Sequence, residues 1–186
     1  MFNRNFLLML FTFLFAIQLS SQDFGIRFGF NLANVTGEEV EDNSIRPGLQ
    51  IGPVLDHHFN NLLTLHTGVI FSMKGANFTI NNESENLASN FIDIPVLLRF
   101  NDKSGLYFES GIQLGFLVAA TYDGDDVSDF YNDTDYQAVL GLGYSMNKIR
   151  FDFRYNFSMG SVISNPYSTD VSLKNHVMAI CASYTL

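Results

Sequence analysis

Large apolar side chains alternate with small or polar residues through most of the chain after residue 21, and this period of two constrains the fold most. In residues 24–32 every second position is Phe, Ile or Leu, and Gly, Arg or Asn stand between them; residues 149–157 repeat the pattern. Successive side chains of an extended strand point to opposite faces, so the pattern predicts β-strands. Eight strands are expected, near residues 24–34, 47–57, 62–74, 91–100, 105–118, 135–145, 149–159 and 175–186.

The predicted connections alternate in length. Three are tight, at residues 58–61, 101–104 and 146–148. The other four are long, at about residues 35–46, 75–90, 119–134 and 160–174. This alternation predicts an all-β, eight-stranded antiparallel up-and-down barrel with two unlike ends, and the even strand number places both termini at the end with the short turns.

Residues 1–21 have the features of a secretory signal peptide. Asn3 and Arg4 form a polar, positive start, an apolar run follows over residues 6–17, and small residues end the segment at Ser20 and Ser21. A helix that spans a bilayer needs about 20 apolar residues, so this run is short for a membrane anchor, which remains the alternative. The expected organisation is a signal peptide over residues 1–21 and one barrel domain over residues 22–186.

Two kinds of eight-stranded barrel fit an alternating pattern, and the non-apolar face distinguishes them. A soluble lipocalin-like barrel points apolar residues inward, whereas a membrane barrel points them toward lipid. The non-apolar face here is rich in Gly and has few charges, which favours a crowded, narrow lumen over a solvated surface. The charges on that face nearly balance and predict an ion-pair network in the lumen, formed by Arg27, Asp56, Asp93, Arg99, Glu109, Asp152 and Arg154 together with Lys74 and Arg150.

Lys74 and Arg150 lie nearest the predicted strand ends, so water is expected around these two side chains. The lumen is not expected to be wholly polar, because Val54, Ile70 and Leu97 share the inward parity. Leu117 has it as well. Pro53 and Pro95 fall inside predicted strands and cannot donate a backbone hydrogen bond, so each predicts a bulge or a broken ladder bond.

The apolar face places an aromatic residue near the short-turn or terminal end of seven strands. Aromatic residues gathered at one height of a barrel are typical of the girdle at a membrane–water interface. The predicted girdle consists of Phe24, Phe59, Phe100, Phe108, Tyr144, Phe151 and Tyr184. A second girdle toward the opposite end would contain Phe71, Phe116, Tyr136 and Phe157.

Four segments together resemble the PorT-like outer-membrane β-barrel domain common in Bacteroidota. They are residues 25–34 (GIRFGFNLAN), residues 91–100 (FIDIPVLLRF), residues 109–111 (ESG) with Gly115, and residues 154–156 (RYN). The resemblance spans nearly all of residues 22–186 and implies location and architecture, but no single activity. The chain ends in Leu186, where such barrels usually have an aromatic residue recognised by the insertion machinery.

The sequence gives only weak evidence for metal-binding or catalytic residues. Asp123, Asp125, Asp126 and Asp129 cluster in one connection, near Asp133 and Asp135, but no Glu closes an EF-hand, so a solvated acidic loop is favoured over a calcium site. The four His residues, His57, His58, His66 and His176, lack metal-ligand spacing. Cys181 cannot form an internal disulfide, and we interpret it as a packing residue.

The expected function is that of a non-enzymatic integral outer-membrane barrel with a lumen filled by side chains. It would act by binding through its loops or as a subunit of an envelope or secretion complex, with outer-membrane lipid, lipopolysaccharide or another envelope protein as partners. No cofactor is expected, and the net charge of −9 argues against nucleic acid. The alternatives are a lipopolysaccharide-modifying outer-membrane enzyme and a soluble lipocalin-like periplasmic carrier.

Overall fold

The computed structural model describes residues 22–37, 43–80, 83–163 and 173–186. The predicted signal peptide therefore lies outside the described residues. Within them, no helix is long and apolar enough to cross a bilayer.

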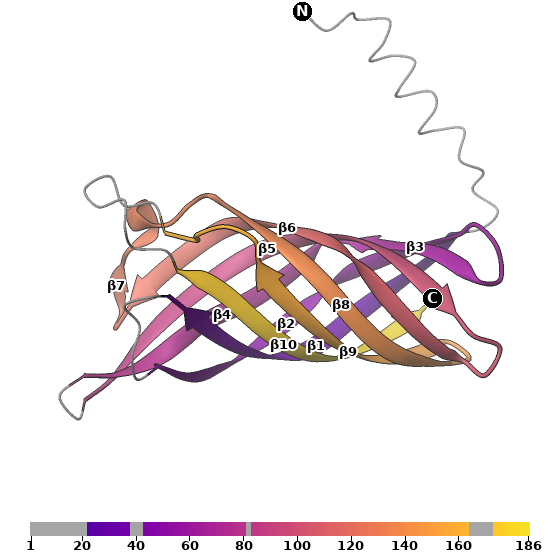
Figure 1. Cartoon of the computed structure of the whole chain (residues 1–186), viewed down its shortest axis with the longest axis horizontal. Coiled ribbons are helices and arrows are strands. Elements are labelled where there is room, and N and C mark those ends of the chain that lie inside the picture. The colour runs from indigo at the N-terminus through magenta and orange to yellow at the C-terminus, as the bar shows by residue number, and fades with distance from the viewer. Residues whose placement is uncertain (1–21, 38–42, 81–82, 164–172) are drawn as a thin grey trace, which may run out of the picture.

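One antiparallel sheet of ten strands closes into a barrel. The sheet closes because β1 pairs with both β2 and β10, the second and last strands of the chain (Figure 1). The strands are β1 (Gln22–Thr36), β2 (Asn43–His58), β3 (Leu63–Gly68), β4 (Ile70–Ile80), β5 (Glu83–Asn101), β6 (Leu106–Tyr122), β7 (Asp125–Asp126), β8 (Thr134–Met146), β9 (Ile149–Ser158) and β10 (Lys174–Thr185), with the 3-10 helix η2 at Ser128–Phe130.

The ring itself has the eight predicted strands. β7 is a two-residue arm paired only with β6, while β3 and β4 are two parts of one strand interrupted at Val69. The pairing of β2 keeps its register across this interruption, since Val54 pairs with Gly68 and Ile51 with Phe71. All-β architecture and an up-and-down antiparallel barrel are thus confirmed.

The break between β3 and β4 at Val69 is explained by proline, which has no backbone N–H. With the register kept, Val69 lies opposite Pro53, whose nitrogen has no hydrogen to donate. β5 pairs with the other side of the same strand, and its register places Pro95 opposite Gly68. The two prolines therefore flank one site without a bulge, where the Val69 N–H still donates to the Pro53 carbonyl at 3.0 Å and the bond that would need a Pro53 N–H is missing. Register shifts occur elsewhere, at Asn90/Phe91 and between Ile45 and Gln50.

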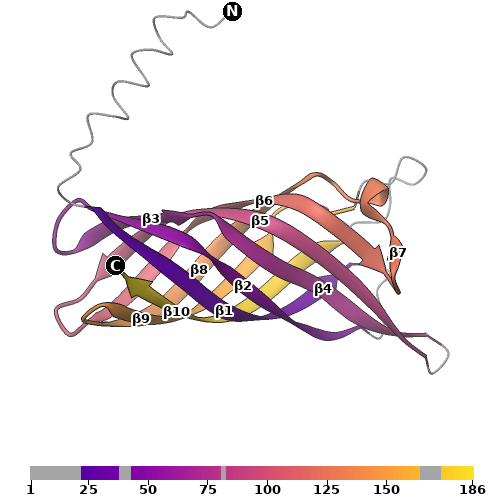
Figure 2. The same ribbon diagram turned by 180° about the vertical axis from the view of Figure 1, so that it is seen from behind.

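The prediction of a long connection over residues 75–90 is wrong. β4 continues to Ile80 and β5 begins at Glu83, so the two strands form a hairpin that projects from the barrel (Figures 1 and 2). The apolar–polar alternation fades here although the backbone ladder continues, because a side chain outside the bilayer need not be apolar. Polar pairs replace it, and the Asn86 amide donates to Asn77 Oδ1 at 2.8 Å.

The barrel has two unlike ends. The short-turn end contains the β2–β3, β5–β6 and β8–β9 turns and also Leu186, and the long-loop end contains β7, η2 and the β4–β5 hairpin (Figures 1 and 2).

Apolar side chains face outward and ionic ones inward. On β9, Phe153 is 47% exposed whereas Arg154 is 2% exposed, and Phe151 and Asp152 show the same contrast. A soluble barrel requires the opposite arrangement. The alternative of a lipocalin-like carrier is therefore wrong for this chain.

Candidate functional site

The lumen holds five cations and five carboxylates, and every one is buried. They are Arg27, Lys74, Arg99, Arg150 and Arg154 with Asp56, Asp93, Glu109, Asp135 and Asp152. The expectation of water around Lys74 is wrong, whereas Arg150 is buried but borders a pocket at the short-turn end. Lys74 is fully buried because β4 continues well beyond it, and Arg150 reaches inward to a carboxylate.

A chain of ion pairs crosses the middle of the lumen. Arg154 Nε lies 2.5 Å from Glu109 Oε1 and 3.0 Å from Asp152 Oδ1. Asp152 also pairs with Arg27, and Glu109 also pairs with Arg99 at 3.0 Å. Glu109 and Asp152 therefore each contact two guanidinium groups. This satisfies the requirement that buried charges be paired and hydrogen-bonded.

Asp56 extends this network toward the short-turn end. Its Oδ2 lies 3.0 Å from Arg99 Nη1 and 2.7 Å from Arg150 Nη2. Its other oxygen lies 2.5 Å from His66 Nδ1. His66 was not among the predicted network residues, although its inward parity on β3 is readable from the sequence.

A separate group surrounds Lys74. Its ammonium lies 2.8 Å from Asp93 Oδ1 and 4.0 Å from Asp135 Oδ2. Asp135 also accepts hydrogen bonds from Gln137 at 2.6 Å and Ser158 at 2.7 Å. Asp135 opens the predicted strand at residues 135–145 but is not among the predicted lumen charges; the structure has it as the second residue of β8, pointing into the lumen.

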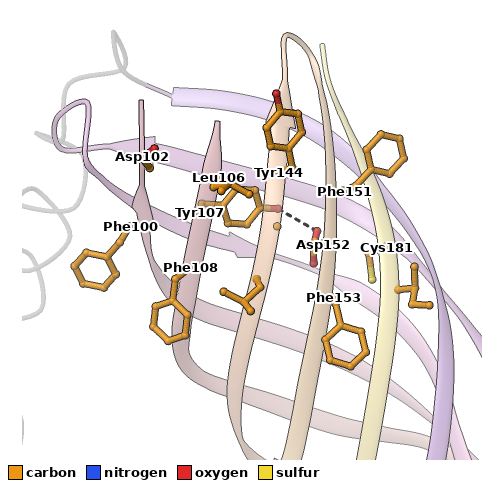
Figure 3. Close-up of a pocket in the computed structure, with 13 residues that line it drawn as sticks. Phe100, Asp102, Leu106, Tyr107, Phe108, Tyr144, Phe151, Asp152, Phe153 and Cys181 are labelled. Atoms are coloured by element: carbon orange, nitrogen blue, oxygen red, sulfur yellow. Dashed lines mark hydrogen bonds between the residues drawn. The ribbon is translucent and has the colours of Figure 1, made fainter. Parts of the chain in front are cut away.

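Glycines make room for these large side chains. A Cβ built at Gly143 would overlap the Tyr107 ring, and one at Gly141 would lie 2.9 Å from Glu109 Cγ. Tyr107 fills the lumen beside Gly143 and donates a hydrogen bond to Asp152 Oδ2 at 3.3 Å (Figure 3). The Gly-rich inner face thus follows from a lumen with space only for selected bulky groups.

An apolar cluster lies between the ionic groups and the long-loop end of the barrel. We call it the apolar plug; its buried members are Val35, Ala76, Leu87, Ala120, Tyr131, Val162 and Leu173. Burial raises the pKa of Tyr131, which keeps its hydroxyl neutral. Sequence reasoning missed the plug because several of its residues come from predicted connections, where periodicity gives no inward or outward assignment.

The seven predicted girdle residues all project from the outer wall and are exposed in the isolated barrel. Figure 3 shows Phe100, Phe108 and Phe153 pointing away from the lumen. Phe71, Phe116 and Tyr136 of the second predicted girdle are also exposed, and Phe157 is half-buried.

The acidic connection forms a hairpin turn and a second turn closed by a side chain. Asp123 and Gly124 both have positive φ, as a two-residue type I′ hairpin turn requires, and they join β6 to β7. Asp126 accepts a hydrogen bond from the Ser128 backbone, which holds the pKa of this carboxyl below its usual value. Among the described residues, no three His, Cys, Asp or Glu side chains are placed to hold a metal ion.

A closed barrel with an ionic lumen and an apolar outer wall defines the class of integral membrane β-barrels. The sequence matches a family model described as the outer membrane protein beta-barrel domain over residues 18–164. The chain therefore belongs to the outer membrane protein β-barrel domain family and is an integral outer-membrane protein.

One solved structure supports this fold, and a second is a weaker match. Neisserial surface protein A is similar, with a TM-score of 0.61 and 12% identity, and the match covers 88% of this chain and 97% of that one. The attachment invasion locus protein of Yersinia pestis, in complex with the heparin analogue sucrose octasulfate, matches with a TM-score of 0.48, 16% identity and coverage of 89% and 99%. No curated protein matches the sequence.

Proposed function

We propose that this protein is a non-enzymatic outer-membrane barrel that works by binding through its long-loop end. The observation that carries the proposal is the filled lumen, in which paired charges occupy the centre and the apolar plug lies above them. A barrel filled in this way offers no aqueous path for solutes. The long-loop end then remains as the part of the protein that can meet a partner, either an external ligand or another member of an envelope or secretion complex.

The orientation follows from barrels of this kind, whose short turns face the periplasm and whose longer loops face outward. Both termini would then be periplasmic, which agrees with export by a signal peptide over residues 1–21. The girdle residues would lie at the periplasmic membrane interface, and lipopolysaccharide would surround the opposite end. The motifs in residues 25–34 and 91–100 support a PorT-like barrel of Bacteroidota.

Cysteine labelling tests this orientation. The native Cys181 is buried, so it contributes little background. On intact cells, a membrane-impermeant maleimide should label Asp125→Cys, at the long-loop end. It should label Asp102→Cys, in the β5–β6 turn, only after the outer membrane is permeabilised. The reverse pattern would show that the short turns face outward.

The binding role is tested by affinity capture from native envelopes in gentle detergent. Changing Asp123, Asp125, Asp126 and Asp129 together to Asn removes four charges from the long-loop end and retains side chains of nearly the same shape. We expect partners recovered with the wild-type protein to be lost or strongly reduced, because charged rims steer and orient association. Asp102→Asn is the matched control at the other end and should retain them. Equal recovery with the fourfold variant would contradict binding through this surface.

A further inference from the structure

A polar pocket of about 430 Å³ opens at the short-turn end of the barrel, next to the ionic groups of the lumen. Its polar lining residues are Arg99, Arg150, His58, Asn60, Asn61, Asn101 and Ser145. No carboxylate is among the described residues that line it. The pocket therefore presents mainly hydrogen-bond donors and positive charge.

The lumen charges are divided unequally along the barrel. The group that reaches this pocket contains four guanidinium groups, from Arg27, Arg99, Arg150 and Arg154, against three carboxylates, from Asp56, Glu109 and Asp152. The group around Lys74 has the opposite imbalance, with one ammonium against Asp93 and Asp135. No ion pair within the described ranges joins the two groups, so one positive charge is in excess toward the short-turn end.

Arg150 carries this excess charge to the pocket. It is 7% exposed and lines the pocket, and its one ion pair among the described residues is with Asp56. Nη2 lies 2.7 Å from Asp56 Oδ2, but that carboxylate is already shared with Arg99 and His66. A guanidinium has five N–H donors, so Arg150 can bind a further acceptor in the pocket while it keeps its contact with the shared carboxylate.

We infer that this pocket binds an anionic oxygen group, a phosphate or a carboxylate, between Arg150 and the asparagine amides of the β2–β3 turn. Arginine recognises these groups with paired N–H donors, and the amides and Ser145 would complete the donor set. The ligand would be either a soluble anion or the headgroup of an anionic phospholipid. This site lies at the end opposite the long loops and is independent of the proposed binding role.

Inorganic phosphate is the probe, titrated against the full barrel in maltoside micelles and followed by ³¹P NMR. The wild-type protein should show saturable binding, and Arg150→Gln should weaken it by about tenfold or more, as expected for loss of a charged hydrogen bond. Asn60→Asp is the second variant, because its carboxylate can still accept from the Leu62 and Leu63 amides while it repels an anion. Its binding should weaken to a similar extent.

Lys148→Gln is the matched control, since Lys148 is an exposed cation of the same end outside the pocket. It should change phosphate affinity less than about twofold, as an exposed charge contributes little. The absence of saturable binding to the wild type, or an equal loss in Lys148→Gln, would overturn the inference. Adding phosphatidylglycerol separates the two sources: weaker apparent phosphate binding identifies a lipid headgroup as the ligand, and unchanged binding identifies a soluble anion.

Discussion

Replacing Lys74 with methionine should destabilise the folded barrel by about 3–5 kcal/mol, the cost typical of removing one partner from a buried ion pair. Lys74 is fully buried and is the only cation paired with Asp93 and Asp135 in the described structure. Its loss would leave two carboxylates in a lumen without a counterion. Methionine fills much of the same volume, so the change reports on charge more than on a cavity.

The measurement is urea unfolding of the barrel reconstituted in liposomes, followed by the band shift between folded and unfolded forms on gels. Lys148→Met removes an exposed lysine and should change the free energy of unfolding by less than about 1 kcal/mol. Adding Asp93→Asn to Lys74→Met should recover part of the loss, because one uncompensated charge is removed. An unchanged midpoint in Lys74→Met, or no recovery in the double variant, would contradict the need for pairing in this group.

The barrel was predictable from the sequence because its outer wall obeys a strict period. On β9, five alternate positions from Ile149 to Phe157 are large and apolar, so orientation and strand location are both readable. The same parity placed Arg27, Glu109 and Asp152 in the lumen, where the structure also has them. Which of these residues pair with each other was not predictable, since strand tilt and side-chain length decide it.

The predictions were weakest where the chain leaves the bilayer. There a strand can continue with polar residues on both faces, so composition no longer marks its end. Asp135 opens the predicted strand at residues 135–145 but was grouped with the acidic residues that precede it, and Lys74 was placed at a strand end because the alternation fades after it. The Asp123-Gly124 dipeptide is a recognised hairpin signal, yet the sequence interpretation treated this segment only as a solvated acidic loop.

Replacing Arg154 with methionine should cost about 3 kcal/mol, less than the loss at Lys74, within the range for breaking a buried pair. Arg154 joins Glu109 to Asp152, but Glu109 still contacts Arg99 and Asp152 still contacts Arg27 after the change. Each carboxylate therefore keeps one cation, whereas those around Lys74 keep none.

Arg154→Lys separates charge from geometry in this network. A lysine ammonium is a compact charge without the Nε–H group that Arg154 donates to Glu109 Oε1 while it also lies 3.0 Å from Asp152 Oδ1. Its unfolding free energy in the same liposome assay should fall between those of the wild type and Arg154→Met. If Arg154→Met instead lost as much stability as Lys74→Met, the remaining Arg99 and Arg27 contacts would not be compensating, and the lumen would act as one indivisible network rather than as two groups.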